Sequence, residues 1–178
     1  RSVLDLYKLL NVFENHDIKF KSATEVYDTT TAMGRMFITI VAALAQWERE
    51  NLGERVRMGM MEKARSGKWA VSLPPYGYDR KDDYLVINEA EAMTVRKVFD
   101  MYLSGKYGVG KIARRLNTEG IKTKSNSTWN DVTLRYLLTN PIYIGTMRYN
   151  YRVNTEQYFE IEDAAPAIIS EVDFQRVQ

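Results

Sequence analysis

The chain has 178 residues, a formal net charge of +2 and 45% hydrophobic residues. This length suits one medium domain or two small ones, and the apolar content excludes wholesale disorder. Cysteine is absent and His16 is the only histidine, so a disulfide framework and a thiolate or histidine metal site are excluded. Because the sequence has no apolar run of membrane length and no signal peptide, we expect a cytoplasmic protein.

The charge is unevenly distributed along the chain. Lys and Arg outnumber Asp and Glu by six to three over residues 49–78 and by nine to two over residues 105–152, whereas the remaining segments are acidic. Clustered cations with interleaved aromatic residues are typical of a surface that contacts nucleic acid phosphates. A solvated face with local ion pairs is the alternative.

Residues 2–15 predict a helix that ends before His16, and residues 18–27 predict a short strand. Residues 31–66 then predict one helix of about 50 Å, which is longer than a small domain requires. We therefore expect its first half to pack against a parent domain or a sister subunit, and its basic second half to reach nucleic acid. The apolar stripe of the first half consists of Met33, Phe37, Ile40, Leu44 and Trp47.

Residues 67–77 contain Pro74 and Pro75 and predict a linker. A hairpin is expected over residues 78–87, followed by a helix that Asn88 caps with Glu91 in a capping box and that Gly105 ends.

Two short helices follow, over residues 109–120 and about 130–138. With the basic loop between them they resemble a helix-turn-helix, although this loop is longer than usual. A second hairpin is predicted over residues 142–161, and Ser170 is expected to cap a last helix. The side chains predicted to point inward from the 130–138 helix are Val132, Leu134, Leu137 and Leu138.

The residues define no self-contained active site. His16 has no Ser, Cys or Asp at a diagnostic spacing, and no phosphate-binding glycine loop follows a strand. The remaining candidates are cations suited to phosphate, because an arginine can hold two phosphate oxygens and stabilise charge on phosphorus. They are Arg1, Arg49, Lys111, Arg114 and Arg115.

Several segments together resemble the serine site-specific recombinases, especially the large serine integrases and transposon recombinases. Residues 28–69 are similar to the helix and exit segment that end the catalytic domain of this family, and Arg1 to Asp5 resemble the close of its Asp-Arg-Leu-x-Arg-Ser motif. Downstream, PPYGY, KIARRLNTEGIKT, Trp129 and NPIYIG resemble the recombinase DNA-binding domain in the same order.

The resemblance implies a mainly α fold with small β-hairpins, which is an α+β class. Residues 1–66 would be the C-terminal part of a resolvase-like α/β catalytic domain that includes the long helix, and residues 67–77 a linker. Residues 78–178 would be a mainly helical DNA-binding domain.

The resemblance also implies a reaction. In this family a serine attacks a DNA phosphodiester, forms a phosphoserine link, and four subunits exchange strands without a metal or cofactor. Arg1 matches the motif arginine at the scissile phosphate and Arg49 matches the helix arginine that joins it. Glu48 would orient these groups and Asp5 would support them. The long helix would form a homodimer or homotetramer.

The sequence departs from the family because it lacks the Tyr-x-Arg-x-Ser strand that carries the nucleophile. We therefore expect this chain to be a fragment of bacterial, phage or mobile-element origin that cannot cleave DNA by itself. Ser2 lies at the wrong position to replace the nucleophile.

The partner expected on this basis is double-stranded DNA, in the form of an attachment half-site. The 130–138 helix is the candidate for the major groove, with Asn130, Thr133 and Arg135 outward. Arg65 and Lys68 would follow the minor groove. The cations expected to hold the phosphate backbone are Lys111, Arg114, Arg115, Lys122 and Lys124.

Two other functions remain open from the sequence. A non-catalytic dimeric transcriptional regulator would use the long helix only to dimerise, and would need no Arg1 and Arg49 pair at one phosphate. A structural helical scaffold with incidental charge would not retain DNA at moderate salt.

Overall fold

The computed structural model describes residues 3–21, 29, 31–71, 73–151 and 155–178, and these form two compact units. The first unit is Arg1–Met58 and the second is Gly59–Gln178. The fold is mainly helical with two small antiparallel strand pairs, which confirms the expected class. No helix in the described ranges combines the length and the apolar character needed to span a membrane.

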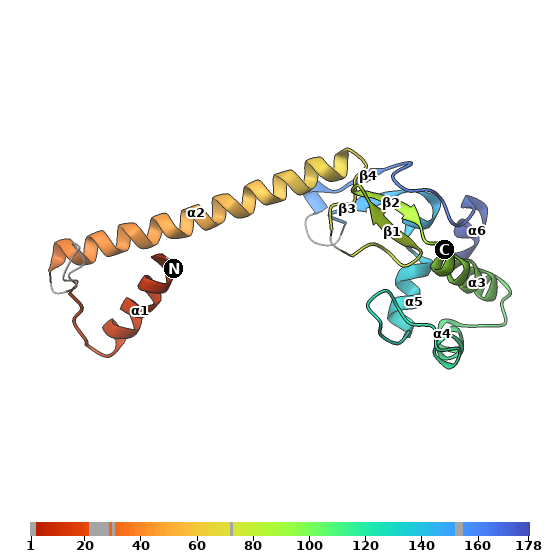
Figure 1. Cartoon of the computed structure of the whole chain (residues 1–178), viewed down its shortest axis with the longest axis horizontal. Helices are drawn as coiled ribbons and strands as arrows, with labels where there is room; N and C mark the ends of the chain where they lie inside the picture. The colour runs from red at the N-terminus through yellow and green to blue at the C-terminus, as the bar shows by residue number, and fades with distance from the viewer. Residues whose placement is uncertain (1–2, 22–28, 30, 72, 152–154) are drawn as a thin grey trace. The chain divides into compact units, whose positions relative to one another are not determined.

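In the first unit, helix α1 spans Val3–Asn15 and helix α2 begins at Ala32. The Thr31 hydroxyl accepts a hydrogen bond from the Gly34 amide at 3.0 Å, so Thr31 caps α2. The helix is continuous over Ala32–Arg65, as expected (Figure 1). Most of the strand predicted over residues 18–27 lies outside the described residues.

The apolar stripe of α2 is exposed in the chain by itself. Its five side chains are 40–68% exposed in the structure. The described residues do not cover them, and their packing against a parent domain or a sister subunit stays a prediction. Burial of the stripe therefore requires surface from elsewhere.

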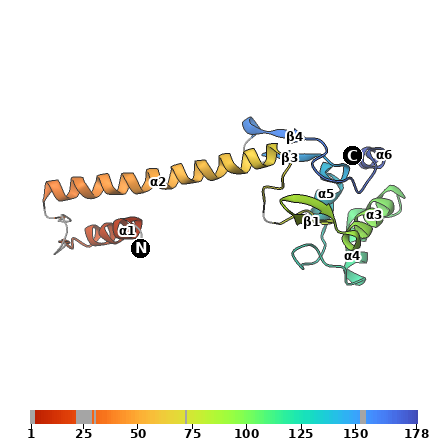
Figure 2. The same ribbon diagram turned by 45° about the horizontal axis from the view of Figure 1, so that its top comes forward.

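In the second unit, strand β1 (Tyr78–Lys81) pairs antiparallel with β2 (Tyr84–Ile87). Asp82 and Asp83 form the turn, and both have positive φ, as a two-residue hairpin loop requires. Strands β3 (Met147–Tyr149) and β4 (Phe159–Ile161) form the second pair, which Figure 2 shows beside the helices of this unit. Both predicted hairpins are present, although the second is shorter than expected.

The helices of the second unit agree with the predicted segments. They are α3 (Glu89–Leu103), α4 (Val109–Thr118), α5 (Asp131–Leu138) and α6 (Glu171–Val177), with short 3-10 turns η1 (Pro141–Ile144) and η2 (Thr155–Gln157). Ser170 caps α6 by accepting a hydrogen bond from the Asp173 amide at 3.1 Å. The helical stop at Gly120 has a φ of +75°, a conformation that favours glycine.

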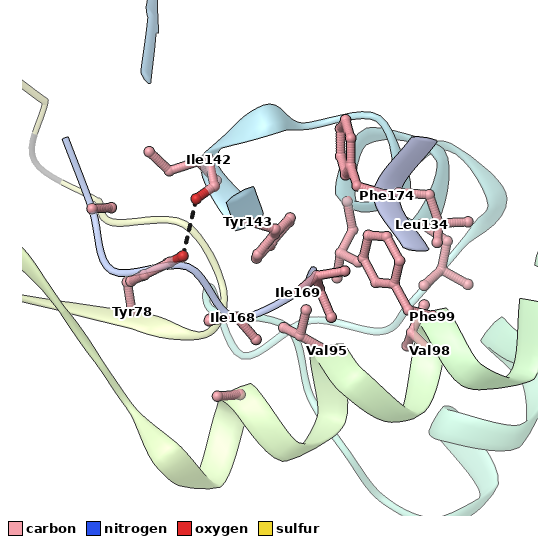
Figure 3. Close-up of a cluster of buried hydrophobic side chains, with 14 of the residues drawn as sticks. Tyr78, Val95, Val98, Phe99, Leu134, Ile142, Tyr143, Ile168, Ile169 and Phe174 are labelled. Atoms are coloured by element: carbon pink, nitrogen blue, oxygen red, sulfur yellow. Dashed lines mark hydrogen bonds between the residues drawn. The ribbon is translucent and has the colours of Figure 1, made fainter. Parts of the chain in front are cut away.

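One apolar core joins these elements. Figure 3 shows Val95 and Phe99 of α3 facing Tyr143 of η1 and Phe174 of α6. The Tyr78 hydroxyl donates to the Ile142 carbonyl at 3.0 Å and also lies 2.8 Å from the Pro166 carbonyl. Burial raises the pKa of this phenol, which stays protonated as the donor. A buried polar group is thereby satisfied inside the core.

The segment 67–77, expected to be a linker, packs against this core. Trp69 and Tyr76 contact it, and the Trp69 amide donates to the Asp83 carbonyl at 2.7 Å. Gly77 is buried with a φ of +98°, and a Cβ there would lie 2.9 Å from Ile168 Cδ1. The two prolines therefore lie in an ordered approach to the hairpin.

Asn88 caps α3 as predicted, because its side chain accepts a hydrogen bond from the Glu91 amide at 3.2 Å. The predicted capping box is wrong in its second half. The Glu91 carboxylate accepts from the Gly77 amide at 2.9 Å, and the Asn88 amide donates to the Gly77 carbonyl. Glu91 thus holds the entry to the hairpin.

Candidate nucleic-acid interface

Helices α4 and α5 pack together (Figures 1 and 2). They carry five of the predicted DNA-binding residues, Lys111, Arg114, Arg115, Thr133 and Arg135. Their facing sides contribute Ile112 and Leu116 from α4 and Leu134 from α5 to the core. Gly110 lies where the two helices approach, since a Cβ at Gly110 would be 3.3 Å from an Asp131 carboxylate oxygen. This close approach places the start of α4 beside the start of α5.

The long connection between these helices is held by a side-chain clamp. Asn117 on α4 donates from Nδ2 to the Trp129 carbonyl at 2.9 Å and accepts from the Trp129 amide at 2.9 Å. The Trp129 ring is buried and lies edge-on against Tyr76, with centroids 4.9 Å apart. The chain is therefore fixed just before α5 begins, which explains how a loop longer than the usual turn still positions the second helix.

Lys124 anchors the middle of the same connection. Its ammonium lies 2.8 Å from a carboxylate oxygen of Asp79 and 2.8 Å from one of Glu91. Burial opposes its charge, but the two hydrogen bonds outweigh burial and raise the pKa of Lys124. The hydrogen bond from Lys124 lowers the pKa of Asp79. Lys124, expected at the phosphate backbone, is thus bound within the protein.

Two residues expected to read bases form the cap of α5 instead of standing free. The Asn130 side chain accepts from the Thr133 amide at 2.9 Å, and the Thr133 hydroxyl accepts from the Asn130 amide at 3.0 Å. This is a complete capping box, which holds both side chains against the backbone. The cap occupies the Asn130 side-chain oxygen and the Thr133 hydroxyl, so a base contact through either oxygen would compete with it.

The outward face of α5 consists of Val132, Arg135 and Tyr136. Val132 is 75% exposed, so its predicted inward orientation is wrong. Helix geometry gives the reason, because Val132 lies two and five residues before Leu134 and Leu137, and such spacings fall on different sides of a helix. This spacing was the signal in the sequence that could have identified Val132 as a surface residue.

The cations of α4 are all exposed. Lys111 has no ion pair or side-chain hydrogen bond among the described residues, and Arg114 donates to the Gly110 carbonyl at 3.3 Å. Arg115 pairs with Glu119 at 3.2 Å and lies over the Tyr107 ring. Hydrogen bonds from Lys97 and then Arg115 lower the pKa of Glu119. This face therefore offers Lys111 and Arg114 to an anion most readily.

The other predicted DNA-binding cations have different surroundings. Lys122 is exposed in the loop and, like Arg135, has no ion pair or side-chain hydrogen bond in the described part of the chain. Arg65 lies over the Phe159 ring at 5.1 Å, and Lys68 lies over the Tyr84 ring at 5.8 Å. Both aromatic contacts leave the positive groups at the protein surface.

Arg148 also belongs to the basic segment of residues 105–152, but its contacts stabilise the fold. It donates from Nη2 to the Thr139 carbonyl at 2.9 Å, at the C-terminus of α5, and lies 4.6 Å from the Tyr151 ring centroid. A cation at the end of a helix stabilises its dipole. Sequence reasoning missed this role because residues 139 and 148 meet only through the turn of η1.

The expected catalytic residues lie in the first unit. Glu48 and Arg49 are adjacent, exposed residues of α2, and Asp5 is exposed on α1. Arg1 lies outside the described residues. Their grouping around one phosphate therefore stays a prediction.

Comparison with known proteins identifies the families that the two parts of the chain match. Residues 89–178 match the family described as Recombinase, and residues 1–69 match the family described as Resolvase, N terminal domain. The chain is 37% identical over 76 residues to a DNA-invertase of Escherichia phage P1, covering 43% of this chain and 41% of the relative. It is 31% identical over 100 residues to the transposon Tn917 resolvase of Enterococcus faecalis, covering 56% and 54%.

A solved structure described as the crystal structure of an LSR–DNA complex matches with a TM-score of 0.54 and 27% identity. The match covers 69% of this chain and 37% of that one. The chain spans between 26% and 54% of the length of the curated relatives that it matches.

The chain belongs to the serine recombinases, a family of DNA strand-exchange enzymes. Within this family it combines a resolvase-type region with a Recombinase domain.

Proposed function

We propose that this chain is part of a serine site-specific recombinase, and that its second unit binds one half-site of an attachment sequence in duplex DNA. The observation that carries the proposal is the surface of α4 and α5, where Lys111, Lys122 and Arg135 are exposed without a protein partner among the described residues. Such cations release counterions from DNA when they neutralise phosphates. A match to a recombinase–DNA complex supports the same partner.

The binding proposal is tested with duplex DNA recovered from a random pool by retention on the chain, here called the selected duplex. Anisotropy measurements should show affinity for it that falls roughly a thousandfold between 50 and 200 mM salt, if six or more phosphates are neutralised. A random duplex of equal length is the control for specificity. An affinity independent of salt, or no retention of any duplex, would contradict the proposal.

For the first unit, the proposed chemistry is phosphoserine-linked strand exchange. Arg49 would hold the scissile phosphate together with Arg1, with Glu48 orienting Arg49 and Asp5 supporting the site. A guanidinium suits this role because it can hold two oxygens and stabilise the charge that develops during transfer. The attacking serine would be supplied by sequence outside this chain, since the family pattern that carries it is absent here.

The catalytic proposal is tested in the full-length protein by trapping its covalent complex with DNA. Arg49→Ala should abolish the covalent complex while leaving affinity for the selected duplex unchanged. Arg55→Ala is the matched control, because Arg55 is also exposed on α2. Covalent attachment at the wild-type level by Arg49→Ala would exclude Arg49 from catalysis. Binding without any covalent complex in the wild type would favour a non-catalytic regulator.

A further inference from the structure

The outward face of α5 combines exposed apolar side chains with an arginine that has no side-chain partner among the described residues. Val132 has the largest exposed fraction of any large hydrophobic residue described, 75%, and Tyr136 one turn later is 47% exposed. Arg135, three residues after Val132, lies beside it on the same side of the helix. The two apolar side chains therefore form a ridge that stands next to a cation.

The cap of α5 makes this ridge the part of the helix that can approach a base. The side-chain oxygens of Asn130 and Thr133 are bound to each other's backbone amides, which holds both side chains against the start of the helix. The opposite side of the helix is buried through Leu134, Leu137 and Leu138. The exposed residues of the first turns are Val132, Arg135 and Asp131, whose carboxylate lies near Gly110 of α4.

The chemistry of the ridge identifies what it can recognise in DNA. A valine has no donor or acceptor, so the feature of a base pair that it can distinguish in the major groove is the C5-methyl group of thymine. The nearby cations, nine Lys and Arg against two Asp and Glu over residues 105–152, favour a polyanion as the occupant of this surface. An exposed aliphatic side chain within this basic surface is complementary to the major groove of DNA, where the thymine methyl group is an apolar feature among polar base edges.

We propose that Val132 is a specificity-determining residue that contacts a thymine methyl group in the half-site. The inference rests on the proposed function of the second unit as a DNA-binding domain. Arg135 on the same face would supply the polar contact to a neighbouring base pair. Val132 thereby replaces Asn130 and Thr133 as the reader of sequence at the start of α5.

The test removes the methyl group from the DNA and the isopropyl group from the protein, separately and together. Each thymine of the selected duplex is replaced in turn by deoxyuridine, and affinity for the 178-residue chain is measured by anisotropy. At one thymine the replacement should weaken wild-type binding by about threefold to tenfold. Val132→Ala should weaken binding to the methylated duplex by a similar factor and should be insensitive to deoxyuridine at that position.

Val172→Ala is the matched control, because Val172 is 69% exposed on α6, away from α5 in sequence and on another helix. It should retain wild-type affinity and full sensitivity to deoxyuridine. Thermal melting of both variants should equal that of the wild type, since neither side chain is buried. If Val132→Ala kept the deoxyuridine sensitivity at every thymine, or if no thymine were sensitive, Val132 would not read a methyl group. Those results would still leave salt-dependent duplex binding intact, whereas loss of all duplex binding would contradict the proposed function itself.

Discussion

Lys124 and Arg135 both belong to the basic segment of residues 105–152, here called the basic block, yet one is paired inside the protein and the other is exposed. The ammonium of Lys124 is held 2.8 Å from Asp79 and 2.8 Å from Glu91, with its side chain 17% exposed. Arg135 is exposed on α5 and has no ion pair in the described part of the chain. A charge already paired inside the protein supports the fold, whereas an exposed one is available to a ligand. Counting cations along the sequence therefore overstates the DNA-binding surface.

The comparison extends to the other cations of the block. The engaged group consists of Arg115, Lys124 and Arg148. Arg114 is intermediate, because its Nε donates to the Gly110 carbonyl while its side chain is exposed. The open group, which has no ion pair or side-chain hydrogen bond within the described ranges, consists of Lys106, Lys111, Lys122 and Arg135. We expect the engaged group to affect stability and the open group to affect affinity.

The largest effect on stability is expected at Lys124. Lys124→Met should lower the free energy of unfolding by about 2 kcal/mol, because it leaves two carboxylates close together without their cation. Chemical denaturation measures this loss, and affinity for the selected duplex below the melting transition should stay within about twofold. Lys122→Met is the control, and its free energy of unfolding should lie within about 0.5 kcal/mol of the wild-type value. Equal destabilisation by the two variants would remove the distinction between the groups.

The next effect is expected at Arg135 and concerns specificity. Arg135→Ala should weaken binding to the selected duplex by about 1 to 3 kcal/mol and relax the preference at one base pair. Thermal melting should not change, because the side chain is exposed. Repeating the pool selection with the variant measures the preference. Equal losses on selected and random duplexes would mean that Arg135 contacts only the backbone.

The pH dependence of stability should separate the Lys124 cluster from the open cations. The pKa of Asp79 is lowered in the folded protein, so its contribution is present above the unfolded value of about 4 and is lost as pH falls through the folded pKa. The pKa of Lys124 is raised, so its contribution is present below about 10.4 and is lost as pH rises through the folded pKa. The difference in free energy of unfolding between the wild type and Lys124→Met, measured from denaturation curves, should therefore become smaller at both low and high pH. A constant difference between them from pH 3 to 11 would contradict this role.

The smallest effect is expected at Lys111. Lys111→Ala should weaken binding to the selected and the random duplex by the same factor. It should also reduce the steepness of log affinity against log salt concentration by about 0.9, the value for one lost phosphate contact. Lys81→Ala on β1 is the control and should leave the slope unchanged. A slope that Lys111→Ala does not alter would place Lys111 outside the interface.

Much of the fold could be predicted because its signals are local. Asn88, Ser170 and Gly120 mark helix ends through residues only a few positions away, and all three act as the sequence indicates. The hairpin over residues 78–87 follows from an alternating pattern around a polar turn. Family resemblance supplied the wider arrangement.

The candidate site was less predictable because its contacts are distant in sequence. The partners of Lys124 lie 45 and 33 residues away, so no local pattern reveals that its charge is engaged. Asn130 and Thr133 have polar side chains that could contact bases, but the same hydrogen-bonding groups also let them cap α5. Val132 could have been placed correctly by its spacing from the buried leucines.

The most direct test of the account is a titration of the isotope-labelled chain with the selected duplex, followed by amide chemical shifts. We predict the largest changes in α4, in residues 121–130 and in α5, with Lys111 and Arg135 among them, and little change in β3, β4 and α6. Shifts concentrated on β3, β4 and α6, with α5 unaffected, would contradict the assignment of the DNA-binding surface.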